Sequence, residues 1–142
     1  MAASAVRSTR ALERMRPTSN DRLEIRDDKL KGRGVFAAAP IAAGTLIEAA
    51  PVIIVPAAEC PLLDRTILDD YYFRWDGALD GEGRGAVPLG LVALCNHSRR
   101  PRARVRRNLA QGTLDLVALV TIPAGEEVTI DYNCPLWFAA ED

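Results

Sequence analysis

The side chains best suited to chemistry stand in two short segments near the C-terminal end of the chain. The first segment, Asn96-His97-Ser98, follows an apolar run and contains the only histidine of the sequence. Burial of an amide or imidazole is costly unless its donors and acceptors are paired, so Asn96 and His97 must pair within the core or with a ligand. The second segment ends in Tyr132, after a short β-rich stretch. A phenol at a strand end usually serves packing, but it can also reach out of the sheet.

A glycine pair, Gly32-Arg33-Gly34, stands upstream of both segments. A dinucleotide-binding fingerprint needs a third glycine and a following helix, whereas Val35-Phe36 continues as a strand, so a Rossmann site is not expected. Two interpretations remain. The spacing alone favours a plain tight turn, and the alternative is a place where missing side chains let the backbone approach a ligand closely.

The sequence predicts no metal site. Its cysteines, Cys60, Cys95 and Cys134, are odd in number and widely spaced, and a single histidine cannot complete a zinc site of familiar spacing. We therefore expect reduced thiols and a cytoplasmic protein.

The length of 142 residues and the net charge of −1 limit the possible architectures. A chain of this size forms one domain with a real core, and its charge balance favours neither nucleic acid nor membrane as a partner. Turn formers at 17–21 divide a flexible N-terminal arm, residues 1–20, from a domain over residues 21–142. The arginine-rich composition of residues 1–16 also resembles that of an organelle transit peptide, so organelle targeting stays open.

The pattern of the remaining chain predicts a mainly β domain. One helix is expected at 61–71, with Leu63, Ile67 and Leu68 on one face. Two similar hairpin corners are expected at 41–47 and 122–128, each turning on a glycine. Strands are expected at 22–26, from 35 onward, at 46–55 with prolines that push it to an edge or bend, and at 86–89, 103–109, 113–121 and 127–131.

A run of arginines from Arg99 to Arg107 is the one strong charge cluster. Arg102, Arg104 and Arg106 alternate, so they would share one face of a strand. Such a run is usually a solvated face, although it could instead contact an acidic partner or a phosphate backbone.

Taken together, the segments resemble the ordered motifs of SET-domain protein-lysine methyltransferases. Motif likeness covers Lys31 to Ala37, Leu68 to Phe73, Leu89 to Pro101 and Gly125 to Tyr132. The size is similar to that of the small free-standing viral and bacterial SET proteins. The resemblance implies a mainly β, β-clip-like fold of several short sheets, with one or two short helices and a knot-like C-terminal threading.

The resemblance also implies S-adenosylmethionine as cofactor, a protein lysine as substrate and no metal. Tyr132 would be the catalytic residue, and Tyr72, Phe73 and Trp75 would line the channel for the lysine. The residues implied to hold the cofactor are Gly32, Arg33, Gly34, Tyr71, Asn96, His97, Tyr132, Trp137 and Phe138.

Two further expectations accompany the resemblance. The alternative function is a catalytically silent SET-like module that binds a peptide or an acidic partner, and a homodimer is expected from the short C-terminal tail. The family usually has asparagine after the proline of the third motif, where this chain has Arg102.

Overall fold

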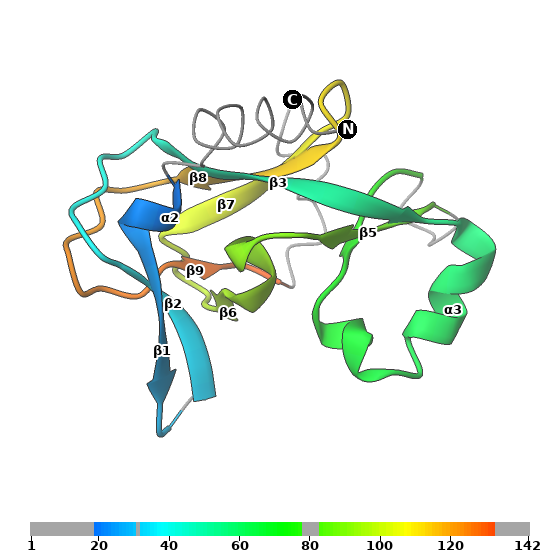
Figure 1. The fold of residues 1–142 in the computed structure, drawn as a ribbon, viewed down its shortest axis with the longest axis horizontal. Helices are drawn as coiled ribbons and strands as arrows, with labels where there is room; N and C mark the ends of the chain where they lie inside the picture. The colour runs from blue at the N-terminus through cyan, green and yellow to red at the C-terminus, as the bar shows by residue number, and fades with distance from the viewer. Residues whose placement is uncertain (1–18, 31, 78–82, 133–142) are drawn as a thin grey trace, which may run out of the picture.

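The computed structural model describes residues 19–30, 32–77 and 83–132. This part of the chain is mainly β, as predicted, and its strands form one five-stranded sheet and two two-stranded sheets (Figure 1). The elements are, in chain order, α2 (Ser19–Arg22), β1 (Leu23–Asp28), β2 (Gly32–Ala37), β3 (Leu46–Val55), the 3-10 turn η1 (Ala57–Glu59), α3 (Cys60–Leu63), the 3-10 turn η2 (Ile67–Asp70), β4 (Phe73–Arg74), β5 (Gly85–Pro88), the 3-10 turn η3 (Leu91–Leu94), β6 (Asn96–His97), β7 (Ala103–Asn108), β8 (Thr113–Ala118) and β9 (Thr129–Ile130).

The five-stranded sheet has the order β4-β5-β3-β8-β7, and all its neighbours are antiparallel. The predicted edge position of 46–55 is therefore wrong, because β3 is the central strand, whereas the alternative of a bend at the prolines stays a prediction. The first half of β3, 46–51, pairs with β8, and its second half, 52–55, pairs with β5. Pro51, which has no N–H to donate, lies where the strand changes partners, so the proline costs the sheet no hydrogen bond there.

The two predicted hairpin corners are present and bond to each other. Ile41 and Ile122 exchange both backbone hydrogen bonds, with N–O distances of 2.9 and 2.8 Å. Gly44 and Gly125 turn the chain at φ angles of +84° and +86°, a region that glycine enters without strain. These corners fix the chain segment after β2 against the one before β9.

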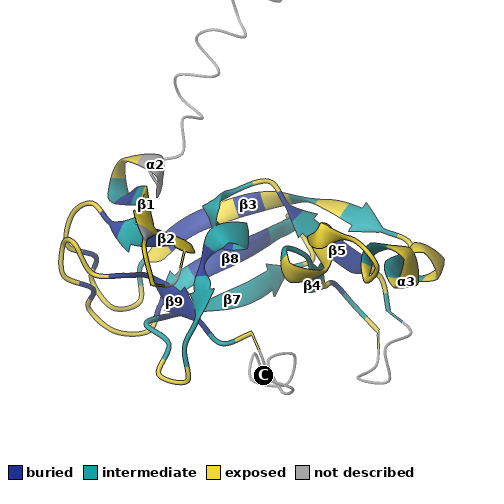
Figure 2. Cartoon of the chain, turned by 90° about the horizontal axis from the view of Figure 1, so that it is seen from below, coloured by how far each residue is buried: buried dark blue, intermediate teal, exposed yellow. Residues whose placement is uncertain are grey.

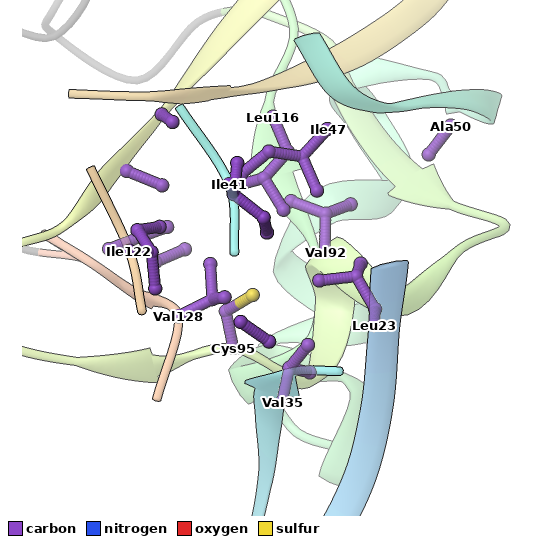
Figure 3. Packing of buried hydrophobic residues seen from close by; sticks show 14 residues of the cluster. Leu23, Val35, Ile41, Ile47, Ala50, Val92, Cys95, Leu116, Ile122 and Val128 are labelled. Carbon is purple, nitrogen blue, oxygen red and sulfur yellow. The ribbon is translucent and has the colours of Figure 1, made fainter. Parts of the chain in front are cut away.

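The main hydrophobic core lies between the five-stranded sheet and the segments that carry β2, η3 and β9. Figure 2 shows buried residues along β8 and β9, and the buried residues of β3 lie in its first half. Figure 3 shows Val35, Cys95 and Val128 close together in this core, and all three residues are fully buried, with 0% exposure. Each of the three lies within one of the motifs identified in the sequence, so core packing fixes those motifs in place.

The helix predicted at 61–71 is wrong in its extent, because the segment divides into α3 and η2. Thr66 leaves the helical region at φ −118° and ψ 171°, and its hydroxyl accepts a hydrogen bond from the Leu68 N–H at 3.1 Å. Thr66 therefore caps η2, and its extended backbone separates η2 from α3. Ile67 and Leu68 are exposed and share no buried face.

The glycine pair does not form the turn that its spacing favoured. Gly32 and Gly34 lie inside β2, paired with Asp28 and Arg26, and the turn falls at residues 29–30. Several strands are also shorter than predicted, notably β9 with two residues. The residues just before β9 bond to β2 instead, since the Val128 N–H donates to the Val35 carbonyl at 2.8 Å.

Candidate active site

Three segments that are remote in sequence meet where β6 runs parallel to β9. Asn96 pairs with Thr129 and His97 with Ile130, and the Ser98 N–H donates to the Ile130 carbonyl at 2.9 Å. The strand β2 joins the same place through a bridge between its Phe36 and residue 127. The parallel β6–β9 pair fits the predicted knot-like arrangement of the C-terminal segment, and it brings the third and final motifs side by side.

Asn96 links the first, third and final motifs. Its side-chain amide donates to the Arg33 carbonyl at 3.1 Å and to the Glu127 carboxylate at 2.7 Å. A Cβ at Gly34 would lie 2.6 Å from that carboxylate and 2.9 Å from the Asn96 amide nitrogen. Gly34 is therefore required for this contact between protein groups, whereas the close approach of a ligand to the glycine pair stays a prediction.

Gly32 differs from Gly34, because a Cβ there would meet no atom within 4 Å. Its φ of +79° instead explains the glycine, and the space beside its backbone is open. Arg33 lies between the two glycines and is exposed. The start of β2 thus presents backbone groups to open space directly beside Asn96.

His97 fixes the backbone of the predicted catalytic tyrosine. Its Nδ1 accepts the Tyr132 N–H at 2.9 Å, and the Asp131 carboxylate lies 3.5 Å from the same nitrogen. The rings of His97 and Tyr132 are 5.6 Å apart between centroids. Because Nδ1 accepts this bond, it carries no proton itself, and the imidazole holds the Tyr132 backbone through that nitrogen.

The Tyr132 hydroxyl donates to the Cys95 carbonyl oxygen, so the tyrosine is held at both its ends. Burial, and then repulsion from the ionisable groups of Cys95 and Tyr71, raises the Tyr132 pKa to about 12. The phenol therefore stays protonated at neutral pH. It can orient a ligand through its oxygen, but it cannot serve as a phenolate base.

The aromatic segment 71–75 lies in part at this site. Tyr71, at the end of η2, is half-buried and close enough to influence the Tyr132 pKa. Tyr72 donates to the Asp64 carboxylate, and a Cβ at Gly85 would lie 2.9 Å from its ring. Burial and the Asp64 contact raise the Tyr72 pKa, so this phenol also stays protonated.

Phe73 and Trp75 belong to the core to different degrees. Trp75 is only 4% exposed and forms a second hydrophobic cluster with Ala86 and Leu114, against which the half-buried Phe73 packs. Phe73 also packs against the main core. Trp75 therefore lies behind Phe73 as its support. Two predicted cofactor residues, Trp137 and Phe138, lie outside the described residues.

Two acidic residues of the site region were missed by sequence reasoning. Glu127 bonds to Asn96, and its place inside the final motif is the only sequence signal. The buried Glu48, in β3, accepts the N–H groups of Leu91 and Val92, both at 2.9 Å. Glu48 thereby fixes η3, which lies just before Asn96 in the third motif. The contact crosses the core between residues distant in sequence, so no local pattern predicts it.

The sequence favoured a solvated face for the arginine run, but three of its side chains make hydrogen bonds within the fold. Arg106 donates to the buried Asp115 at 3.2 Å, and Arg107 donates to the Trp75 carbonyl at 2.6 Å. Arg102 bonds to the final motif. These side chains are half-buried, so three members of the run hold the fold together.

In the part of the chain that the structure describes, Cys60 and Cys95 are free thiols, and burial raises the Cys95 pKa. Cys134 lies outside that part of the chain. No three His, Cys, Asp or Glu side chains gather there as a metal site would require, and no helix of that part is long and apolar enough to cross a membrane.

Comparison with known proteins identifies the family. The SET domain family matches residues 32–133, most of the chain, so this protein belongs to the SET-domain family. The predicted family and mainly β fold are confirmed, and the protein is a lysine methyltransferase of this family.

Individual relatives agree with this assignment. The chain is 36% identical over 126 residues to the histone-lysine N-methyltransferase of Schizosaccharomyces pombe that is specific for lysine 37 of histone H3, covering 88% of this chain and 82% of that protein. A candidate histone methyltransferase of Plasmodium falciparum has a similar structure, with a TM-score of 0.63 and 27% identity, over 82% of this chain and 96% of the other. The Neurospora histone lysine methyltransferase DIM-5 shares the fold with a TM-score of 0.62 and 24% identity, over 78% of this chain and 51% of DIM-5.

Proposed function

We propose that this protein transfers a methyl group from S-adenosylmethionine to a lysine of a histone, with Tyr132 as the catalytic residue. The observation that carries the proposal is the junction of β6 and β9, which joins Asn96, His97 and Tyr132 to the start of β2. The histone substrate is supported by the names of the relatives, which describe histone methyltransferases.

The residues at this junction fit the proposed cofactor. The open space beside Gly32 can admit a ligand, and the exposed Arg33 directly follows this glycine in the chain. Main-chain groups there can pair with the polar amino-acid end of the ligand. Tyr71 and the Asn96 side-chain oxygen offer further contacts, and Trp137 and Phe138 remain proposed contacts for the adenine.

The bound cofactor would supply a sulfonium-activated methyl group, and the protein supplies alignment. Tyr132 is held by His97 and by the Cys95 carbonyl, and its hydroxyl oxygen would orient the polarised methyl group. Fixing donor and acceptor in line removes much of the entropic cost of a two-substrate reaction. No covalent intermediate with the enzyme is needed.

The substrate lysine must lose its proton before it attacks. Aromatic walls exclude water and so disfavour the ammonium form, and a nearby sulfonium charge acts in the same direction. Tyr72 and Phe73 are the proposed walls. Trp75 contributes by supporting Phe73 from the core.

Incubation with labelled S-adenosylmethionine and purified histones, ribosomal proteins or a whole protein extract tests the proposal. We expect label on lysine residues of a histone, identified by mass spectrometry. Label confined to another protein would overturn the histone assignment. Cofactor binding without any transfer would instead favour the silent-module alternative. The predicted cytoplasmic location and homodimer stay predictions, which cell fractionation and light scattering can test.

A further inference from the structure

Arg102 stands at the position where this chain departs from the family pattern, and it bonds directly to the final motif. Its guanidinium donates to the Glu127 carbonyl at 2.9 Å and lies 3.2 Å from the Glu126 carboxylate. Its backbone N–H donates to the Thr129 hydroxyl at 3.2 Å, and its carbonyl accepts from the Leu119 N–H at 2.8 Å.

These bonds place Arg102 one step from the proposed cofactor site. Glu127, whose carbonyl it holds, directs its carboxylate to the Asn96 amide at 2.7 Å. The same amide bonds to the Arg33 carbonyl, beside Gly34. A continuous path of contacts thus runs from the guanidinium through Glu127 and Asn96 to the start of β2.

The chemistry of arginine suits this role. A guanidinium offers five N–H donors in a rigid fork, so one side chain can bond to a carbonyl and a carboxylate at once. The Arg102 side chain is 38% exposed, and so its bonds are partly shielded from water. Asparagine is too short to make both contacts from the same backbone position.

We infer that Arg102 is a positioning residue for the cofactor site: it fixes the Glu127 peptide so that the Glu127 carboxylate can orient Asn96. This inference rests on the proposed function, because it assigns Arg102 a role in holding the same cofactor. Arg102 itself does not touch the proposed ligand space, and it acts through Glu127.

The test compares substitutions of Arg102 with a matched substitution of Arg106. Arg106 is equally part of the arginine run, has 41% side-chain exposure and pairs with Asp115, away from Glu127. The dissociation constant for S-adenosylmethionine is measured by calorimetry, and thermal unfolding is measured on the same preparations. Arg102→Leu should weaken cofactor binding about tenfold, the typical effect of losing a hydrogen bond to a charged group.

Two further variants separate positioning from charge and from loss of stability. Arg102→Lys keeps the positive charge without the fork, so it should recover part of the affinity. Glu126→Gln removes the exposed ion pair and leaves the bond to the Glu127 carbonyl, so affinity should change less than about twofold. Arg106→Leu should lower the unfolding temperature while cofactor affinity stays at the wild-type value.

A double-mutant cycle supplies a readout that a merely structural role would not move. Arg102→Leu and Asn96→Ala both remove a contact to Glu127, so their effects on cofactor affinity should be non-additive. Additive effects, or equal losses of affinity in Arg102→Leu and Arg106→Leu, would overturn the inference. Failure of the wild-type protein to bind the cofactor would instead refute the proposed function itself.

Discussion

At the scale of single residues, the site depends on a tyrosine that is held at two points. His97 accepts the Tyr132 backbone N–H, and the Cys95 carbonyl accepts its hydroxyl. The sequence identified Tyr132 and His97 through motif resemblance, but their direct contact was not predicted. It depends on the parallel pairing of β6 and β9, which no local pattern shows.

The raised Tyr132 pKa predicts a particular pH behaviour. The pKa rises from 10.0 in the free residue to about 12 in the folded protein. Folding therefore favours the neutral phenol, and the resulting stability is fully present below about pH 10 and is lost as the pH rises towards about 12. Tyrosinate absorbance is titrated in wild type and in Tyr132→Phe. The difference between the two curves should show one tyrosine that ionises near pH 12 and is absent from the variant. A transition near 10 would show that the phenol is not shielded as described.

Replacement of His97 tests the positioning of Tyr132. His97→Ala removes the acceptor for the Tyr132 N–H, so turnover should fall about tenfold or more as the hydroxyl loses its alignment. Ser98→Ala is the control, because the Ser98 hydroxyl accepts the N–H of the nearby Arg100 at 3.0 Å and makes no hydrogen bond with Tyr132 among the described residues. Steady-state methylation kinetics check both variants, and an equal loss in the two would remove His97 from its positioning role.

At the scale of elements, β2 illustrates why a correct motif can have a wrong local structure. The glycine pair was favoured as a turn, yet it lies within β2, and Gly34 is needed for a contact with Glu127 from another motif. The central place of β3 was also unpredictable, because it depends on strand partners that are distant in sequence. The break at Thr66 has a local cause, the cap bond from the Leu68 N–H, which the apolar spacing did not show. The local sequence pattern was sufficient to predict strands near β1, β7 and β8.

Gly34→Ala should disrupt the site through steric contact. The added Cβ would lie 2.6 Å from the Glu127 carboxylate, so the Asn96–Glu127 bond cannot persist unchanged. We expect cofactor affinity to fall about tenfold and the free energy of unfolding to fall by about 1–3 kcal/mol.

The matched control is Gly112→Ala, at the turn between β7 and β8. Gly112 has a φ of +69° and no atom within 4 Å of its added Cβ, so backbone strain alone should cost about 1 kcal/mol. Calorimetric binding and urea unfolding measure both variants. Cofactor affinity that is unchanged in Gly34→Ala would contradict the close approach of β2 to Asn96.

At the scale of the whole molecule, buried carboxylates connect elements that the core alone would leave free to shift. Asp115, only 2% exposed, accepts bonds from Arg106, Asn108 and Thr113 at 3.2, 3.3 and 2.7 Å. The local sequence pattern predicted strands at β7 and β8, although β8 ends at Ala118 and not at residue 121. It could not show that an acidic residue of β8 faces inward, because that orientation is stabilised only by the donors of both strands.

Asp115→Ala should lower the free energy of unfolding by about 3 kcal/mol, since it leaves a partly buried arginine without its partner. Urea unfolding measures the change. Asp76→Ala removes an exposed ion pair with Arg84 and should have little effect. Equal stability of wild type and Asp115→Ala would show that the network does not stabilise the fold.

Tyr132 is the residue that we propose aligns methyl transfer. The most direct test is the single-turnover rate of methyl transfer to the histone substrate, measured for wild type and Tyr132→Phe at saturating S-adenosylmethionine. We predict a rate about a hundredfold lower in the variant, with the cofactor dissociation constant nearly unchanged. A rate equal to that of wild type would contradict the catalytic role of Tyr132.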